Sequence, residues 1–338
     1  MACMRIETVI VGGGQAGLAM GYQLRRRGRP FVILEAGEQV GDSWRHRWDS
    51  LRLFTPARYD GLPGMRFPAP GWSFPTRLEF AGYLQEYAER FRLPVRTGVT
   101  VKRLSADFVL ETDDGPYRPD NVVVATGFDR RPRPYGPGIH SSGYRRPSQL
   151  PDGDVLVVGA GNSGADIALE LAASRRVMLS GRHPGQLPWR IDRPVSRLLA
   201  PPVFFAFRHL LTARTPPGRR LLEHSGPLIR VKNADLAAAG VVRVPRVTGV
   251  DGGRPVLADG RTIDVPNVIW CTGFEPDTSW IECPGFDGTH RRGVTGRPGL
   301  YLLGWMLQHT LASAMVQGVG RDAAFLADHI AHQLKRPG

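Results

Sequence analysis

Cysteine is scarce in this sequence, and the scarcity limits what the protein does. The three cysteines, Cys3, Cys271 and Cys283, are too few and too scattered to form a disulfide framework or a metal site. No C-x-x-C or C-x-x-x-x-C pair occurs, so the neighbouring dithiol of flavin disulfide reductases is missing. We therefore expect neither a metal centre nor dithiol chemistry.

Lysine is equally rare, because Lys102, Lys232 and Lys335 are the only lysines behind a net charge of +13. The arginines that supply the rest are dispersed, whereas a nucleic-acid-binding surface gathers basic residues into a stripe. We expect no nucleic-acid partner.

Long apolar runs are also missing. None approaches the roughly 18–20 residues of a membrane span. Glycines at positions 12 to 17 interrupt the first apolar run, which argues against a signal peptide. These absences predict no transmembrane segment and a cytoplasmic location.

Two glycine-rich turns organise the 338 residues, a length that allows two domains. Each follows an apolar run, precedes a helical pattern and reads G-x-G-x-x-G. In this motif the first glycine permits a tight turn, the second lets backbone approach a pyrophosphate, and the third packs helix on strand. The following helix N-terminus attracts phosphate. The glycines are Gly12, Gly14 and Gly17 in the first turn, and Gly159, Gly161 and Gly164 in the second.

The residue after the next strand distinguishes the two turns. Twenty-three positions after Gly12 stands Glu35, and the same offset from Gly159 reaches Arg182. A carboxylate accepts hydrogen bonds from ribose hydroxyls, whereas a guanidinium pairs with a 2′-phosphate. We predict FAD at the first turn and NADPH at the second.

The rest of the chain predicts an α/β protein with two Rossmann-like dinucleotide-binding domains. The NADPH domain (151–274) is inserted into a discontinuous FAD domain (1–150, ending in a linker over 132–151, and 275–338). We expect a helix over 77–92, strands over 95–104 and 107–112, and a β-meander over 241–260. A last strand over 299–304 precedes a helix over 311–334 that Gly318 and Gly320 break.

A loop over 41–75 is too long for a bare connector and favours a binding role. Arg45, Trp48 and Thr55 are the candidate catalytic residues, because this loop has the length to reach the reactive edge of a flavin. The alternative is a surface loop pinned by core tryptophans.

The segment 193–220 interrupts the second domain with an apolar stretch and several arginines. Its internal prolines and short length favour a substrate-pocket cover or a subunit contact over a membrane-surface element. The apolar residues 198–207, with Trp305, Met306 and His309, indicate a small apolar or aromatic substrate. A homodimer is left open.

These features resemble the flavin-containing monooxygenase family, including its bacterial and YUCCA-type members. The likeness covers nearly the whole chain and includes a linker fingerprint at Gly136, His140 and Tyr144, with Pro134 in place of the usual phenylalanine. Tyr144 stands where Baeyer–Villiger relatives carry tryptophan, which favours heteroatom oxidation. The resemblance implies that His140 and its neighbours position the domain junction and NADP⁺.

The resemblance also implies the reaction. NADPH reduces the flavin, O₂ adds to give a C4a-(hydro)peroxyflavin, and this adduct oxygenates nitrogen, sulfur or carbon of the substrate. Two alternatives are open: an NADPH-dependent flavin reductase or oxidase that releases H₂O₂, and a dinucleotide-binding protein without turnover.

The predicted cofactor residues form two sets. The FAD set is Gly12, Gly14, Gln15, Ala16, Gly17, Glu35, Ala36, Trp44, Arg45, Val101, Ala125, Thr126, Gly127 and Gly304. The NADPH set is Gly159, Gly161, Asn162, Ser163, Gly164, Ser180, Arg182, His183, His140, Thr272 and Gly273.

Overall fold

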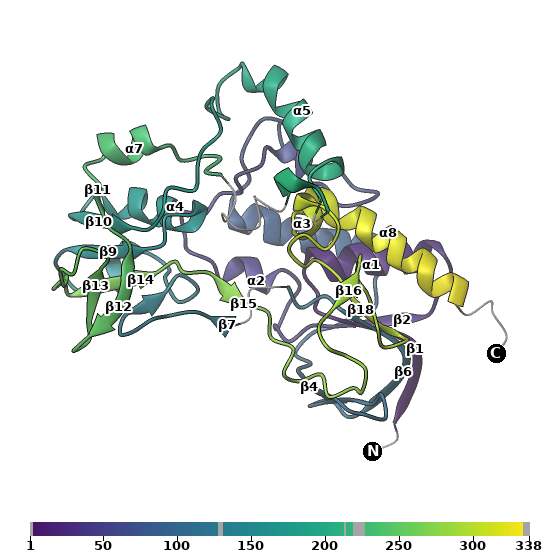
Figure 1. Ribbon diagram of the computed structural model, residues 1–338. Coiled ribbons are helices and arrows are strands. Elements are labelled where there is room, and N and C mark those ends of the chain that lie inside the picture. The colour runs from purple at the N-terminus through teal and green to yellow at the C-terminus, as the bar shows by residue number, and fades with distance from the viewer. Residues whose placement is uncertain (1–2, 128–130, 213, 219–226, 334–338) are drawn as a thin grey trace.

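The structure is a computed structural model that describes residues 3–127, 131–212, 214–218 and 227–333. It contains two main β-sheets, each the centre of its own lobe (Figure 1); the larger sheet has a parallel centre with antiparallel strands beside it, and the smaller sheet is parallel throughout. The larger sheet has the order β16-β17-β18-β6-β1-β2-β3, with β4 and β5 attached beside β6. Its strands are β1 (Met4–Val11), β2 (Phe31–Leu34), β3 (Val95–Arg96), β4 (Val101–Leu104), β5 (Leu110–Thr112), β6 (Tyr117–Val124), β16 (His290–Arg291), β17 (Val294–Thr295) and β18 (Leu300–Leu302).

The centre of this sheet is fully buried, which explains the uninterrupted apolar runs in the sequence. β1 pairs in parallel with β2 and β6, and β18 pairs in parallel with β6. The chain therefore returns to the first sheet near its C-terminal end. Helices α1 (Gln15–Arg26), α3 (Arg77–Arg90) and α8 (Val316–Gln333) belong to this lobe, together with the short α2 (Asp42–Arg45) and η1 (Ala57–Tyr59).

The smaller sheet has the order β11-β10-β9-β14-β8, with every pair parallel. Its strands are β8 (Ile139–His140), β9 (Val155–Val158), β10 (Val177–Ser180), β11 (Val242–Val244) and β14 (Asn267–Trp270). Helices α4 (Asn162–Leu171) and α7 (Asn233–Ala238), the turn η2 (Pro147–Gln149) and the hairpin β12 (Val247–Asp251) with β13 (Arg254–Leu257) complete this lobe.

Two connections join the lobes and run side by side, since β7 (Arg131–Pro132) pairs antiparallel with β15 (Phe274–Glu275). Helix α5 (Ser196–His209) lies above both lobes, and η3 (Leu311–Ala314) lies beside it. The predicted fold class, with one Rossmann-like unit inserted into another, is confirmed.

Several local predictions need correction. The run 95–104 holds two short strands, β3 and β4, and the expected linker contributes β8 to the second sheet. The expected meander is the single hairpin β12–β13, because β11 joins the parallel sheet instead. The predicted helix over 77–92 is confirmed as α3, which ends at Arg90.

The C-terminal helix is not broken at its glycines. η3 ends at Ala314, and α8 then runs without interruption through Gly318 and Gly320. A Cβ at Gly318 would lie 2.1 Å from the Ala312 carbonyl oxygen, and one at Gly320 would lie 2.3 Å from Pro63 Cγ. Close packing, not helix termination, is the reason for these glycines.

Candidate dinucleotide and active site

The first glycine-rich turn has the geometry of a phosphate cradle. Gly12 has φ of +110°, and its Cβ would lie 2.6 Å from the Ala125 carbonyl oxygen. A Cβ at Gly17 would lie 1.9 Å from the Gly12 carbonyl oxygen, so helix α1 packs directly on the turn. In contrast, a Cβ at Gly14 would meet no atom within 4 Å. The second glycine therefore borders open space at the N-terminus of α1, as a pyrophosphate site requires.

The second turn repeats this arrangement. Gly159 has φ of +112°, and its Cβ would lie 2.2 Å from the Cys271 carbonyl oxygen. The corresponding approach at Gly164 is 1.8 Å to the Gly159 carbonyl oxygen, while Gly161 again faces open space. Each first glycine donates its N–H to the end of the next strand at 2.8 Å: Gly12 to Leu34 and Gly159 to Ser180.

The two turns differ in what lies behind them. The Glu35 carboxylate accepts hydrogen bonds from the N–H groups of Gly13 (2.5 Å) and Gly37 (2.8 Å). It lies across the first turn and is only partly buried, so its oxygens border the position that a ribose takes in this kind of fold. Ala36 follows it on the surface, and Val101 begins β4 near the same end of the sheet.

Behind the second turn the exposed residues are basic. Arg182 is exposed two residues beyond β10, and His183 accepts a hydrogen bond at Nδ1 from the Gly185 N–H (2.9 Å). Arg243, on the neighbouring strand β11, donates to the Gly181 carbonyl oxygen at 2.7 Å. Arg243 is not among the residues predicted from the sequence. Only the pairing of β11 with β10 brings this second guanidinium to the site.

Each sheet has a second glycine turn after a central strand, β6 in the larger sheet and β14 in the smaller one. Gly127 and Gly273 have φ of +79° and +81°. His140 accepts at Nδ1 from the Ser142 N–H (3.2 Å), so Nε2 carries the proton and donates to the Gly273 carbonyl oxygen (3.0 Å). The Thr272 hydroxyl donates to the Arg133 carbonyl oxygen. His140 thus holds the turn of the second cradle in position from the junction between the lobes.

Some predicted cofactor side chains make structural contacts. Asn162 clamps the backbone at residues 227 and 229, and the fully buried Ser180 hydroxyl bonds both to the Pro245 carbonyl oxygen and to the Val247 N–H. Ser163 is exposed in the first turn of α4. Their backbone atoms border the cradle, while the side chains of Asn162 and Ser180 hold its walls together.

The short helix α2 contacts the first cradle, and the loop that follows it is partly buried. Trp44 donates from Nε1 to the Gln15 side-chain oxygen at 3.2 Å. Arg45 is held by the Val40 carbonyl oxygen (2.6 Å) and by Asp42 (3.2 Å), and Trp48 is buried. These contacts position the loop. The catalytic roles predicted for Arg45, Trp48 and Thr55 stay predictions.

Thr55 lies in an environment that the sequence did not reveal. Its hydroxyl is hydrogen-bonded to Asp60, a carboxyl group that is 1% exposed. Burial raises the pKa of Asp60 to about 8, although the Thr55 hydrogen bond opposes the shift. Asp60 Oδ2 has no hydrogen-bond partner among the described residues. The pair therefore places a protonated carboxyl group in this loop at neutral pH.

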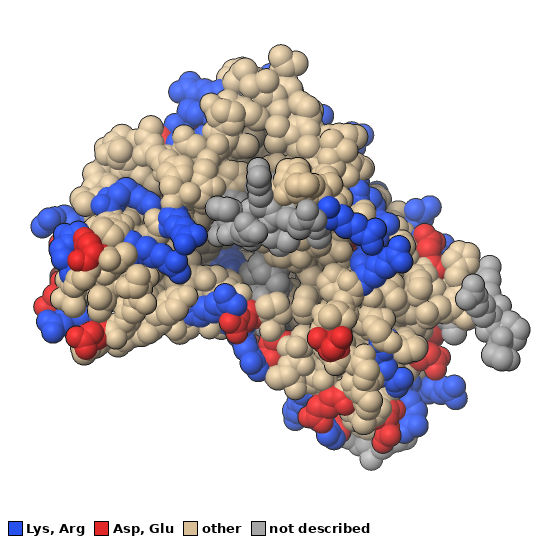
Figure 2. All heavy atoms as spheres, in the orientation of Figure 1, with Lys and Arg blue, Asp and Glu red and all other residues tan. Residues whose placement is uncertain are grey.

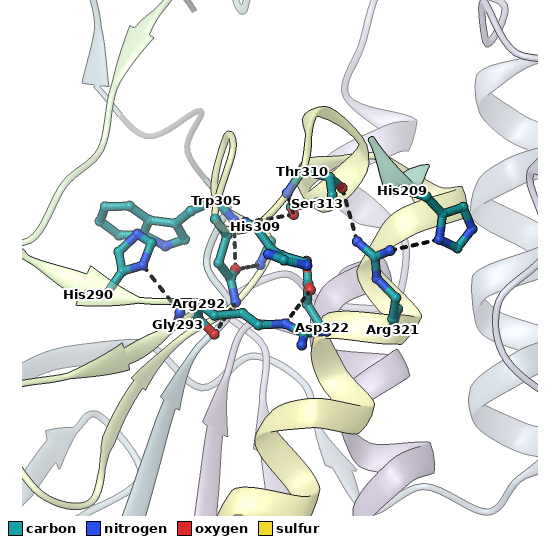
Figure 3. Close-up of polar contacts among 12 residues, drawn as sticks. His209, His290, Arg292, Gly293, Trp305, His309, Thr310, Ser313, Arg321 and Asp322 are labelled. Atoms are coloured by element: carbon teal, nitrogen blue, oxygen red, sulfur yellow. Dashed lines mark hydrogen bonds and ion pairs between the residues drawn. The ribbon is translucent and has the colours of Figure 1, made fainter. Parts of the chain in front are cut away.

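The C-terminal segment completes the surroundings of the first cradle. Gly304 has φ of +81° and lies against Ala16, and its N–H donates to the Gln308 side-chain oxygen at 3.0 Å. Near it, Arg321 of α8 donates to the Thr310 hydroxyl (3.2 Å) and contacts His209 at the end of α5 (3.2 Å) (Figure 3). These bonds tie α5 to α8 of the larger lobe.

An apolar cluster lies beneath that helix. Its members come from the loop over 41–75 (the aromatic loop), from the segment 187–191, from α5, from Ile229 and from the segment around η3, regions that are far apart in sequence. Burial of these side chains explains why α5 packs where it does. They include Phe54, Tyr59, Trp72, Phe204, Phe207, Leu307 and Leu311.

The fold and the paired cradles define an oxidoreductase that takes two dinucleotides. The family model for pyridine nucleotide-disulphide oxidoreductases matches residues 9–210. This chain belongs to that family.

Similar proteins narrow the class. A Geobacillus kaustophilus protein described as an "Uncharacterized oxidoreductase CzcO-like" is 37% identical, over 96% of this chain and 98% of its own length. Indole-3-pyruvate monooxygenase YUCCA1 of rice is 29% identical, over 90% and 88%. The structure of a flavin-containing monooxygenase from Stenotrophomonas maltophilia matches with a TM-score of 0.76 and 29% identity, over 98% and 99%. The predicted resemblance to flavin-containing monooxygenases is confirmed.

Proposed function

We propose that this protein uses FAD and NADPH to transfer one atom of O₂ to a small apolar or aromatic molecule at nitrogen, sulfur or carbon. FAD occupies the cradle of Gly12, Gly14 and Gly17, and NADPH occupies the cradle of Gly159, Gly161 and Gly164. The observation that carries the proposal is the exact repetition of one cradle with an acid behind the first copy and exposed arginine behind the second.

The residues divide the work of binding. Glu35 accepts from the ribose hydroxyls of FAD, and Arg182, with Arg243 beside it, pairs with the 2′-phosphate of NADPH. His140 fixes the Gly273 turn beside the second cradle, which would hold NADPH. The domain boundaries follow as 1–150, 151–274 and 275–338, with β8 extending the second sheet into the linker.

The flavin supplies hydride acceptance and oxygen activation when bound, and the chain supplies orientation and exclusion of water. The inner face of α5 and the aromatic loop form an apolar wall, which accepts an apolar or aromatic substrate. In the loop over 41–75, Asp60 is hydrogen-bonded to Thr55 and keeps its proton at neutral pH because its pKa is raised to about 8. The sequence contains no neighbouring dithiol, and burial raises the pKa of Cys271 to about 12, which disfavours its reactive thiolate.

The test is a sequence of three measurements on purified protein. Visible absorbance after incubation with FAD reports flavin binding, and bleaching of that absorbance by NADPH without oxygen reports hydride transfer. Turnover under ¹⁸O₂ with candidate amines, sulfides, indoles and keto acids then reports oxygen transfer by mass spectrometry. A colourless protein contradicts the proposal. Bleaching followed by stoichiometric H₂O₂ and no labelled product identifies a reductase or oxidase instead.

A further inference from the structure

The inner face of helix α5 packs against the body of the protein. Ala200, Phe204 and Phe207 are buried in the apolar cluster, and His209 contacts Arg321 of α8. These contacts hold the helix in one orientation on the body of the protein. The side of the helix that faces away is therefore fixed as well.

That outer side is apolar and exposed. Leu198 is 77% exposed and Phe205 is 57% exposed, values unusual for large apolar side chains. The spacing of the exposed residues is helical, so they form a continuous stripe along one side of α5. They are Val195, Leu198, Leu199, Pro202, Phe205 and Leu210. A helix that is apolar all round is normally covered on every side.

The charges around this stripe are mainly positive, with the exposed Asp192 before it paired to Arg190. The sequence from position 193 to position 222 contains six arginines and neither aspartate nor glutamate. Arg193, Arg197 and Arg208 are exposed beside the stripe. Figure 2 shows this end of the molecule as a broad uncharged surface with basic residues at its margins. An apolar stripe flanked by arginine is the pattern of a helix that lies in the interface of an anionic membrane.

We propose that the outer face of α5 binds the surface of an anionic lipid bilayer. The sequence favoured a pocket cover or a subunit contact for this segment because of its prolines, but Pro201 and Pro202 lie inside one continuous helix. The stripe inserts among the lipid chains, and the flanking arginines pair with anionic headgroups. Among the residues that the structure describes, no helix is long and apolar enough to cross a membrane. A second copy of the chain is disfavoured as the occupant, because a two-fold contact through this face would bring arginines together without acidic partners on the segment.

The test is sedimentation of the full-length protein with vesicles. One set is phosphatidylcholine alone, and the other is phosphatidylcholine mixed with phosphatidylglycerol. We expect binding to the mixed vesicles only, weakened by salt. Leu198→Asp and Phe205→Asp should each reduce binding about tenfold or more, and Arg197→Glu should also reduce it. Leu78→Asp is the matched control, since Leu78 is likewise 57% exposed but lies on α3.

The measurements distinguish a loss of lipid binding from unfolding and from dimer formation. Thermal unfolding of each variant shows whether the fold is intact, and the exposure of the changed residues predicts that it is. The proposal is overturned by absence of binding to mixed vesicles, by equal binding to both vesicle types, or by an equal loss in Leu78→Asp. Light scattering that shows a dimer separated by Phe205→Asp would also overturn it, with a second copy as the occupant. Because the readout is lipid binding, the result is independent of the proposed oxygenation.

Discussion

Gly14 and Gly161 provide a matched pair of substitutions that tests both cradles. Alanine at either position is conformationally ordinary, since the backbone is extended at Gly14 (φ −76°, ψ −172°) and at Gly161 (φ −73°, ψ −173°). The added Cβ meets no protein atom within 4 Å in either case. We therefore expect the free energy of unfolding of the protein without cofactors to change by less than about 0.5 kcal/mol.

The effect on cofactor binding is much larger. The new methyl group would occupy the open space next to the backbone N–H groups that are proposed to receive the pyrophosphate. Loss of one hydrogen bond to a charged group costs about 1.5–3 kcal/mol, which corresponds to a decrease in affinity of about 10–100-fold. Gly14→Ala should lose this much affinity for FAD and leave NADPH binding unchanged. Gly161→Ala should retain FAD and raise the KM for NADPH.

The assay is titration of the flavin-free protein with FAD, followed by coenzyme kinetics on the reconstituted enzyme. Gly17→Ala is the positive control for damage to the fold, because its Cβ would lie 1.9 Å from the Gly12 carbonyl oxygen. Thermal unfolding should separate it from the other two variants. Wild-type FAD affinity in Gly14→Ala, or loss of the same cofactor in both variants, would refute the assignment of the two cradles.

Three further substitutions test single side chains. Arg182→Ala should raise the KM for NADPH about 10–100-fold and change the KM for NADH little. Alanine at Arg176, another exposed arginine, is the control. Equal effects on both coenzymes would contradict the role of Arg182 at the 2′-phosphate. Because the pKa of Asp60 is raised to about 8, the folded state holds an extra proton that stabilises it at low pH, and this stability is lost as pH rises from about 4 to about 8. In Asp60→Asn this part of the decrease in Tm should disappear, and parallel Tm–pH curves for both proteins would show that Asp60 does not titrate in this way. Arg292→Ala removes the ion-pair partner (3.4 Å) of Asp322, which is 0% exposed, and should lower the free energy of unfolding in denaturant by about 3 kcal/mol. Adding Asp322→Asn to the same chain should restore part of this loss. Additive effects of the two substitutions would argue against the pair.

The local features of the cradles could be predicted because each depends on residues close in sequence. A strand, a glycine turn and a helix N-terminus lie within a dozen positions, and glycine alone tolerates the φ of +110° at Gly12 and +112° at Gly159. Glu35 and Arg182 could be found in the same way, because each lies only one helix and one strand further along the chain. The helix prediction at Gly318 and Gly320 failed for the opposite reason, since the contacts with Ala312 and Pro63 that require glycine there exist only after packing.

What the amino-acid sequence determined by itself was therefore the pair of dinucleotide cradles, their charge difference and the α/β fold class, because all three are set by short-range backbone geometry and by the residues that follow it. Only the tertiary structure decided which side chains meet. It brought Arg243 beside Arg182, buried Asp60 against Thr55 and raised its pKa, and joined α5 to α8 through His209 and Arg321. Burial and long-range contact depend on how distant segments pack, and no spacing along the chain carries that information.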